Sequence, residues 1–247
     1  MIFVVSFDFV TPAFAGETRG SLKTSEHRRI RITLNRTHVQ TCYSSVRLTW
    51  QTIANDKEIK TMTESTRTIF EGRWLRLEKR GKWEYVARTN PGGAAVIVAV
   101  TPENNVLFVE QFRVPIQRQT LEFPAGLIGD SPELANEHAA ITAARELEEE
   151  TDWLPEVVEY VHGGPSSAGM STEFMHFFRA SKLKRTGPGG GVPGENITVH
   201  EIPFAQAAQF VASKVAAGFA VDPKVYAGLY FLRFNTDGVE LATQWWL

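Results

Sequence analysis

EHAAITAARELEEETDW, residues 137–153, is the stretch that decides the fold of this 247-residue chain. Its alanines and Leu147 recur at helical spacing, which predicts one helix with a small apolar face. Glu146, Glu149 and Glu150 stand at positions i, i+3 and i+4, so their β-carbons lie within about 6 Å of one another on a second face. The stretch therefore predicts a helix that packs closely on a sheet and holds three carboxylates in a defined orientation.

These three carboxylates predict a bound cation. Like charges at this spacing repel each other by a few tenths of a kcal/mol per pair unless a cation collects them. Mg²⁺ prefers oxygen ligands and is usually shared between one or two carboxylates and the phosphates of a substrate. The glutamate face therefore favours a phosphorylated substrate, with Mg²⁺ as cofactor and Mn²⁺ as its alternative. A solvated acidic helix face is the alternative interpretation, because glutamates usually lie in water.

Strand-like segments surround the predicted helix. Runs of β-branched and aromatic residues alternate with turn residues, which is typical of a mixed α/β domain preceded by a small antiparallel β unit. The antiparallel unit is expected from the runs at 66–70, 74–79 and 83–88, and the main sheet from those at 94–100, 106–112, 121–128, 157–162, 173–180 and 197–202. Two more helices are expected, one over 204–217 and one that Asp222 caps with Pro223 at its first position.

The first 61 residues differ from the rest in charge. They carry a net charge of +4, whereas residues 62–247 carry −6. A nucleic-acid-binding arm is one interpretation of this basic segment. We favour a disordered extension, or translated upstream sequence with the native start at Met62, because no strand or helix period is sustained there. The expected organisation is an extension over 1–61, a β subdomain over 62–92 and the main domain over 93–247.

Composition limits the cellular compartments and the partners that are expected for the protein. Cys42 is the only cysteine, which excludes an internal disulfide and a cysteine zinc site and favours the reducing cytoplasm. The chain has no apolar run of about 18 residues and only a poor export signal before Gly16, so neither a membrane span nor secretion is expected. The net charge of −2 makes nucleic acid an unlikely partner.

The stretch at 137–153 resembles the Nudix box, whose pattern is Gly, five residues, Glu, seven residues, then Arg-Glu-apolar-any-Glu-Glu-any-Gly-apolar. The positions that match at the required spacing are Glu137, Arg145, Glu146, Leu147, Glu149, Glu150 and Trp153. Two positions depart from the pattern. Asp152 replaces the Gly that ends the helix, and Asp tolerates the positive φ expected there. Ser131 falls on the first Gly, which predicts a small insertion at 128–132.

Flanking motifs narrow the resemblance to the ADP-ribose pyrophosphatase branch of the Nudix family. They are EQFR at 110–113, LEFPAG at 121–126 and SAGMSTE at 167–173, the last in place of a Ser-Pro-Gly-x-Ser-x-Glu loop. The resemblance covers about residues 62–235. It implies an α/β Nudix fold, which is an α/β/α sandwich with a mixed sheet, preceded by a β subdomain that is exchanged in a homodimer. It also implies Mg²⁺-dependent cleavage of a nucleoside diphosphate sugar.

The resemblance further implies roles for the residues of the box. Glu146, Glu149 and Glu150 would bind Mg²⁺, and the main-chain carbonyl of Ala125 would complete the metal site. Arg145 would orient the glutamates. Arg145 and Glu149 are therefore expected among the catalytic residues as well. Metal ions that bridge the diphosphate would withdraw charge from phosphorus and orient the attacking water.

Further residues are expected around the substrate. The family usually supplies a general base from a loop after the Nudix helix, and Glu195, which follows the Gly/Pro run at 187–194, is the favoured candidate. Glu173 is the second candidate and is expected near the substrate. Arg113 would contact phosphate through its bidentate fork, with a structural ion pair as the alternative. Glu122 would line the nucleoside pocket, with core or edge packing as the alternative.

The expected function is hydrolysis of ADP-ribose to AMP and ribose 5-phosphate. Hydrolysis of another nucleotide sugar, such as UDP-glucose or GDP-mannose, is the alternative of the same class, because the box binds the diphosphate that all of them share. An inactive Nudix domain that senses nucleotides is the alternative of another class. Retention of Glu146, Glu149 and Glu150 argues against it, because three carboxylates without a cation stabilise nothing.

Overall fold

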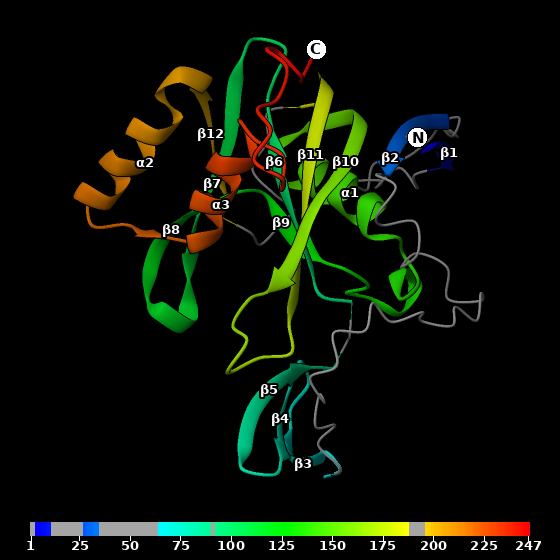
Figure 1. The fold of residues 1–247 in the computed structure, drawn as a ribbon, viewed down its shortest axis with the longest axis vertical. Helices are drawn as coiled ribbons and strands as arrows, with labels where there is room; N and C mark the ends of the chain where they lie inside the picture. The colour runs from blue at the N-terminus through cyan, green and yellow to red at the C-terminus, as the bar shows by residue number, and fades with distance from the viewer. Residues whose placement is uncertain (1–2, 11–26, 35–63, 90–91, 188–195) are drawn as a thin grey trace, which may run out of the picture.

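The computed structural model describes residues 3–10, 27–34, 64–89, 92–187 and 196–247 (Figure 1). Within them, three sheets carry the strands. One sheet has the order β1 (Phe3–Val10), β2 (His27–Leu34), β10 (Trp153–Pro165), β11 (Phe174–Arg185), β6 (Ala94–Ala99) and β9 (Ala125–Leu127). The second has the order β12 (Thr198–Pro203), β7 (Asn105–Arg113), β8 (Arg118–Glu122) and β13 (Ala220–Val221), and the third has the order β3 (Arg67–Glu71), β4 (Leu75–Arg80) and β5 (Trp83–Arg88).

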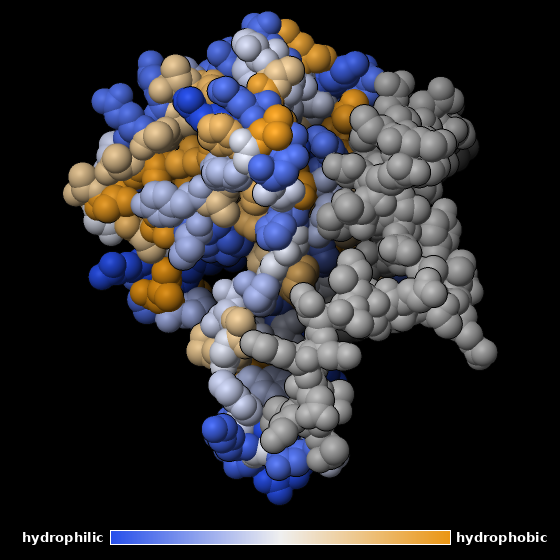
Figure 2. Space-filling model, viewed as in Figure 1, coloured by the Kyte–Doolittle hydropathy of each residue, from blue (hydrophilic) through white to orange (hydrophobic). Residues whose placement is uncertain are grey.

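The described helices are α1 (Ala139–Thr151), α2 (Ala207–Ala216) and α3 (Pro223–Phe231). Single 3₁₀ turns span Val114–Ile116, Pro132–Leu134 and Phe204–Gln206. On the face drawn in Figure 2, apolar surface gathers over α2, where Val215 is half exposed. Of the helices in the described part of the chain, none has the length and hydrophobicity required to cross a membrane.

The alternation of side chains along β6 sets the layers of the fold. Ala95, Ile97 and Ala99 pack with the alanines of α1 in one hydrophobic core. Val96 and Val98 point to the opposite face, into a second core that includes residues of β7, β8, α2 and α3. Successive side chains of a strand point to opposite faces, so this buried strand serves both cores. The predicted mixed α/β fold is confirmed, with helices on both sides of the sheets.

The segment expected as one interrupted strand over 121–128 belongs to two sheets. Leu121 and Glu122 end β8, whereas Ala125 begins β9, which pairs with β6. Pro124 lies between the two strands, and its carbonyl accepts a hydrogen bond from the Ile97 N–H at 2.8 Å. The chain therefore changes sheets at Pro124, and this places β9 beside α1.

The strands expected at 66–70, 74–79 and 83–88 appear as the antiparallel sheet β3–β4–β5, at the lower end of Figure 1. This sheet is joined to the loop after β10 by backbone hydrogen bonds. The Val86 N–H donates to the Met170 carbonyl at 2.8 Å, and the Thr172 N–H donates to the Val86 carbonyl at 3.0 Å. The loop with the SAGMSTE motif therefore carries the contact between the small sheet and the main domain.

Two strands are described within the first 61 residues, where disorder was expected. β1 pairs with β2 in antiparallel fashion, and β2 pairs in parallel with β10, for example Ile32 with Val158. In HRRIRITL, residues 27–34, apolar residues alternate with charged or polar ones, which is the period of a strand. This short period was hidden by the basic composition around it. The other residues of 1–61 lie outside the described ranges.

Candidate active site

Helix α1 has a defined side-chain cap at its start and a left-handed residue after its last turn. Nδ1 of His138 accepts a hydrogen bond from the Ala140 N–H at 3.2 Å. Asp152 has φ 54° and ψ 31°, and its N–H donates to the Glu148 carbonyl at 2.7 Å. This is the conformation that the Nudix pattern assigns to Gly, and Asp adopts it with a modest cost. The departure at Asp152 therefore leaves the end of the helix intact, as expected.

Arg145 lies at the centre of the glutamate face. Its Nη1 is 2.9 Å from Oε1 of Glu146 and 2.9 Å from Oε2 of Glu149. Its Nη2 is 3.3 Å from Oε2 of Glu137, which also accepts a hydrogen bond from the Thr142 hydroxyl at 2.8 Å. Its Nη2 also lies 3.9 Å from Oδ1 of Asp130, so one guanidinium faces four carboxylates. The orienting role of Arg145 stays a prediction for which this geometry is suitable.

Burial makes the glutamate face electrostatically costly. It raises the pKa of Glu146 to about 7; the neighbouring charges of Glu149 and Asp130 also raise it, and the Arg145 guanidinium opposes the rise. Burial likewise raises the pKa of Glu149 against the pull of Arg145. The single guanidinium therefore does not neutralise the carboxylates of this face. Binding of a proton or of a further cation is favoured there.

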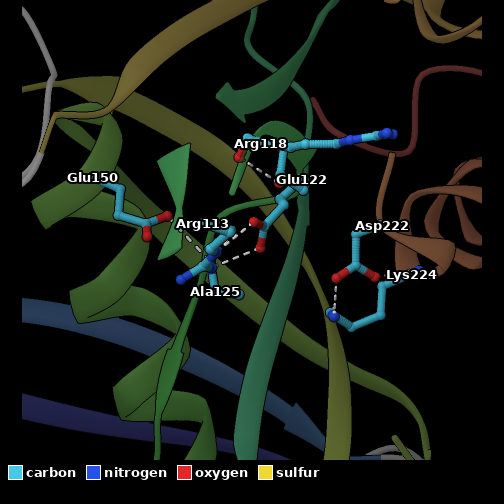
Figure 3. A network of polar contacts seen from close by, with 8 residues as sticks. Arg113, Arg118, Glu122, Ala125, Glu150, Asp222 and Lys224 are labelled. Carbon is cyan, nitrogen blue, oxygen red and sulfur yellow. Dashed lines mark hydrogen bonds and ion pairs between the residues drawn. The ribbon is translucent and has the colours of Figure 1, made fainter. Parts of the chain in front are cut away.

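Glu150 and Gly126 join this face to β9. The buried Glu150 carboxylate accepts a hydrogen bond from the Ala125 N–H at 3.1 Å (Figure 3). Gly126 lies against the Glu146 carboxyl group so closely that a β-carbon at this position would overlap it. A residue with a side chain does not fit there without moving Glu146, which gives Gly126 of the LEFPAG motif a physical reason.

The donor set of the glutamate face fits a hard divalent cation in its chemistry. Its side chains offer only carboxylate oxygens, which Mg²⁺ and Mn²⁺ prefer. In the described residues, however, no three acidic, histidine or cysteine side chains converge in a ready metal site. Glu146 and Glu149 turn to Arg145, and Glu150 turns to Ala125. The predicted ligands are therefore neighbours on one face that are engaged with protein groups.

A cavity of about 630 Å³ is lined by all three residues of β9, but by none of Glu146, Glu149 and Glu150. Four of the residues expected at the site line it: Arg113, Glu122, Ala125 and Glu173. Its volume falls in the range of small-molecule sites, about 300–1,000 Å³. The structure therefore brings the substrate-binding candidates together in one cavity, while the glutamates adjoin it through Ala125 and Gly126.

Arg113 and Glu122 form a bidentate ion pair in this cavity (Figure 3). Nε of Arg113 donates to Oε1 of Glu122 at 2.6 Å, and Nη2 donates to Oε2 at 2.7 Å. The Glu122 side chain is 5% exposed and that of Arg113 is 43% exposed. The hydrogen bonds with Glu122 raise the pKa of Arg113, and the charges of Glu150 and Asp222 add to the rise. The structural ion pair weighed as an alternative for Arg113 is thus present.

Glu173 is paired as well. Nε of Arg88 donates to its Oε1 at 2.5 Å, and the Glu173 N–H donates to the Ser171 hydroxyl oxygen at 2.9 Å. Arg88 ends β5 and lines the same cavity. The small antiparallel sheet therefore contributes a cation to the candidate site.

Among the charged residues that line the cavity, sequence reasoning did not assign three to the site, namely Arg88, Asp222 and Lys224. Asp222 was expected only as the cap of α3, and it does accept a hydrogen bond from the Lys224 N–H at 2.8 Å. The predicted cap could have pointed to Lys224, because a residue that caps a helix also fixes the position of the side chains in the first turn. The predicted base Glu195 lies outside the described residues, which resume at Asn196.

Comparisons with known proteins identify the family of the chain. A family model described as the NUDIX domain matches residues 91–221. The chain is 34% identical to the ADP-ribose pyrophosphatase of Bacillus subtilis, over 51% of this chain and 69% of that protein. It is 35% identical to the GDP-mannose pyrophosphatase of Escherichia coli K12, over 53% and 69%. It is also 32% identical to the methanol dehydrogenase activator of Bacillus methanolicus, over 62% and 83%.

A solved structure titled as an ADP compounds hydrolase has the same fold. It superposes with a TM-score of 0.52 over 68% of this chain and 89% of that chain, at 17% sequence identity. The chain belongs to the Nudix family. The predicted class of enzyme, a Nudix hydrolase, is confirmed by this match.

Proposed function

We propose that this protein hydrolyses the diphosphate of ADP-ribose to AMP and ribose 5-phosphate with Mg²⁺. The broader reaction class, hydrolysis of a nucleoside diphosphate sugar, is supported by relatives that are named for such activities and are 30–40% identical to this chain. ADP-ribose is preferred because two relatives are named for its hydrolysis, one from Bacillus subtilis and one from Mycobacterium tuberculosis.

The observation that carries the proposal is the charge imbalance of α1 next to a cavity. Glu146 and Glu149 share one guanidinium, and the pKa of Glu146 is raised to about 7 by its burial. Such a face is stabilised by a divalent cation, and the adjoining cavity has the size of a small-molecule site. A cation between carboxylates and a cavity is the arrangement that Mg²⁺ takes with phosphorylated substrates.

In the proposed mechanism, Glu146, Glu149 and Glu150 would hold Mg²⁺ or Mn²⁺ together with the Ala125 carbonyl. The bound metal supplies withdrawal of charge from phosphorus and a water of lowered pKa. Arg145 keeps the glutamates apart and oriented, because its guanidinium contacts two of them at 2.9 Å. The oxygen of a water molecule would form a new bond to one phosphorus of the diphosphate while the bond from that phosphorus to the bridging oxygen breaks. The other phosphate leaves with the bridging oxygen, so the products are AMP and ribose 5-phosphate.

Other residues would bind the substrate and accept the proton of the attacking water. Arg113 uses two nitrogens on Glu122 and keeps N–H groups of its half-exposed guanidinium for a phosphate oxygen. Glu195 takes the proton of the attacking water in our proposal, with Glu173 as the second candidate. Glu173 lines the cavity, but its carboxylate is engaged by Arg88 at 2.5 Å, so it would have to leave this ion pair to reach the attacking water.

GDP-mannose is the second candidate substrate. The Escherichia coli protein named for its hydrolysis is 35% identical to this chain, as similar as the Bacillus subtilis ADP-ribose pyrophosphatase at 34%. The diphosphate is common to both substrates, so the metal face does not separate them.

We also propose that the protein is a homodimer in which the sheet β3–β5 of one protomer packs on its partner. This sheet exposes Phe70, Trp74 and Trp83, each at least half exposed. By the strand register, Phe70 shares a face with Leu77, and Trp83 shares the opposite face with Arg80, so apolar side chains are exposed on both faces of this sheet. Exposed apolar side chains at this density favour contact with a partner. We expect a dimer in sedimentation equilibrium, and a monomer after Phe70→Lys with Trp83→Lys. Val215→Lys, on the half-exposed surface of α2, is the control that leaves the dimer intact.

The test of the function is product release from ADP-ribose, UDP-glucose and GDP-mannose with Mg²⁺, for the wild type, Glu150→Gln and Glu148→Gln. Glu148 is on the same helix but off the glutamate face, so its variant controls for the loss of one charge. We expect AMP and ribose 5-phosphate from ADP-ribose, loss of at least 100-fold in kcat for Glu150→Gln, and nearly wild-type rates for Glu148→Gln. A folded wild type that cleaves none of the three substrates contradicts the proposal and supports the sensing alternative.

A further inference from the structure

Lys224 occupies a position that opposes helix electrostatics. Pro223 is the first residue of α3, so Lys224 is in the first turn. The N-terminus of a helix carries a partial positive charge, so a cation in the first turn is unfavourable. A lysine at this position is therefore not explained by the stability of α3.

Asp222 fixes both ends of Lys224. Its Oδ1 accepts the Lys224 N–H at 2.8 Å, and its Oδ2 forms an ion pair with the Lys224 Nζ (Figure 3). The Asp222 carbonyl also accepts the Val225 N–H at 2.9 Å. These first amide groups of α3 are thus already engaged. The donor that α3 presents to a ligand is the ammonium of Lys224, and the adjoining acceptor is the Asp222 carboxylate.

Both residues line the same 630 Å³ cavity as Arg113 and Glu122. Their side chains remain partly exposed, at 19% for Asp222 and 27% for Lys224. The charge of Asp222 reaches Arg113, whose pKa it helps to raise. Each cation on this wall has its own carboxylate, so the wall presents donors and acceptors with little net charge.

We infer that Asp222 and Lys224 bind the adjacent hydroxyl groups of a ribose ring in the substrate. A vicinal diol matches the pair, because one hydroxyl donates to the carboxylate and the other accepts from the ammonium. A phosphate would gain from Lys224 but would be repelled by Asp222, so a neutral polyol fits better. The inference rests on the proposed function, because it assigns a binding role inside the same substrate site. Lys224 becomes a specificity residue, and Asp222 both contacts the ring and positions Lys224.

ADP-ribose contains two such rings, the ribose of the nucleoside and the distal ribose. Both offer the same vicinal hydroxyls, and the two products separate them. AMP carries the first ring and ribose 5-phosphate carries the second. Affinity of each product for the protein therefore distinguishes the two sources.

The experiment compares the wild type with Lys224→Met and Asp222→Asn, and uses Lys184→Met on the exposed end of β11 as the matched control. Asn retains the cap acceptor but removes the carboxylate charge, so α3 is expected to remain folded. For both site variants we expect KM for ADP-ribose to rise about tenfold with kcat within twofold, as for a remote binding contact. The affinity of AMP or of ribose 5-phosphate, measured by calorimetry, should fall by a similar factor. Lys184→Met should match the wild type.

Unchanged KM and unchanged affinity for both products in Lys224→Met would overturn the inference. An equal fall in affinity for both products and for inorganic phosphate would also overturn it, because this indicates a general charge effect. If the wild type cleaves no nucleotide sugar, the proposed function fails. The calorimetric comparison of AMP and ribose 5-phosphate still tests the pair in that case, so the two failures are distinguishable.

Discussion

The glutamate face of α1 and the wall of the adjoining cavity solve the problem of buried charge in opposite ways. On α1, Arg145 is shared by Glu146 and Glu149, so the face has more carboxylates than cations. On the wall, Arg113 has Glu122 and Lys224 has Asp222, so each cation has its own partner. An unbalanced face calls for a further cation, whereas a balanced wall suits the neutral part of a substrate. The contrast favours a diphosphate between α1 and Arg113, whose guanidinium lies near the Glu150 charge, and a neutral part of the substrate beside Asp222 and Lys224.

The largest expected effect, on kcat, comes from removing one carboxylate charge from the glutamate face of α1. Glu146→Gln keeps the size of the side chain and removes one carboxylate charge, so a bound divalent cation loses a ligand. We expect kcat for ADP-ribose to fall about 10²–10³-fold, as for the loss of one electrostatic contact in a site. The metal-free protein should become more stable in urea, because like-charge repulsion is removed. Lower stability together with wild-type activity would contradict the imbalance.

Increasing the imbalance should have the reverse effect on stability. Arg145→Met removes the shared guanidinium and leaves Glu146, Glu149 and Glu137 without their common partner. We expect a loss of about 2 kcal/mol in the metal-free protein, below the 3–5 kcal/mol of a fully buried pair because Arg145 is partly exposed. Urea unfolding with and without Mg²⁺ measures this. Mg²⁺ should recover part of the loss, and an identical loss at all Mg²⁺ concentrations would argue against a cation at this face.

A substitution at the contact between β9 and α1 is expected to have a smaller and more local effect. In Gly126→Ala, the added methyl group overlaps the Glu146 carboxyl group, which is the mobile end of its side chain. We therefore expect the fold to survive and kcat to fall about tenfold, because Glu146 leaves its position. Gly169→Ala is the control, since a β-carbon there meets nothing within 4 Å. Equal activity of the two variants would show that the position of Glu146 is unimportant.

The smallest expected effect is the pH dependence of the metal-free protein. Burial raises the pKa of Glu146 to about 7 from its ordinary value of 4.5. Between these values the folded state binds more protons than the unfolded state, so this group adds stability as the pH falls from 7 to 4.5. The gain should be on the order of 1 kcal/mol and absent in Glu146→Gln. Chemical unfolding at pH 7.5 and pH 5 measures it, and an equal pH response of both proteins would contradict it.

The parts that could be predicted from the sequence are those governed by local rules. The helical period predicted α1, and cap chemistry predicted α3 with its cap at Asp222. The left-handed conformation of Asp152 was expected from the Gly that the Nudix box has at this position. The resemblance to the Nudix box then selected Arg145 and the three glutamates. These features depend on residues within a few positions of one another, which is why a single sequence reveals them.

The parts that were missed depend on contacts between distant segments. Arg113 and Glu122 were both selected, but their pairing with each other required β7 and β8 to lie side by side. Arg88 and Lys224 were not selected, because only the packing of β5 and α3 around one cavity makes them neighbours. The strand at 27–34 was passed over because a basic segment was judged by its composition, although its alternation was visible.

The most direct measurement is divalent-ion binding to the protein without substrate. Mn²⁺ binding is followed by electron paramagnetic resonance, with Mg²⁺ as competitor, for the wild type, Glu149→Gln with Glu150→Gln, and the control Glu148→Gln. We predict that the wild type and the control bind Mn²⁺, that Mg²⁺ displaces it, and that the double variant binds at least tenfold more weakly. A wild type that binds no Mn²⁺, or a double variant that binds it equally well, would contradict the assignment of the glutamate face as the metal site.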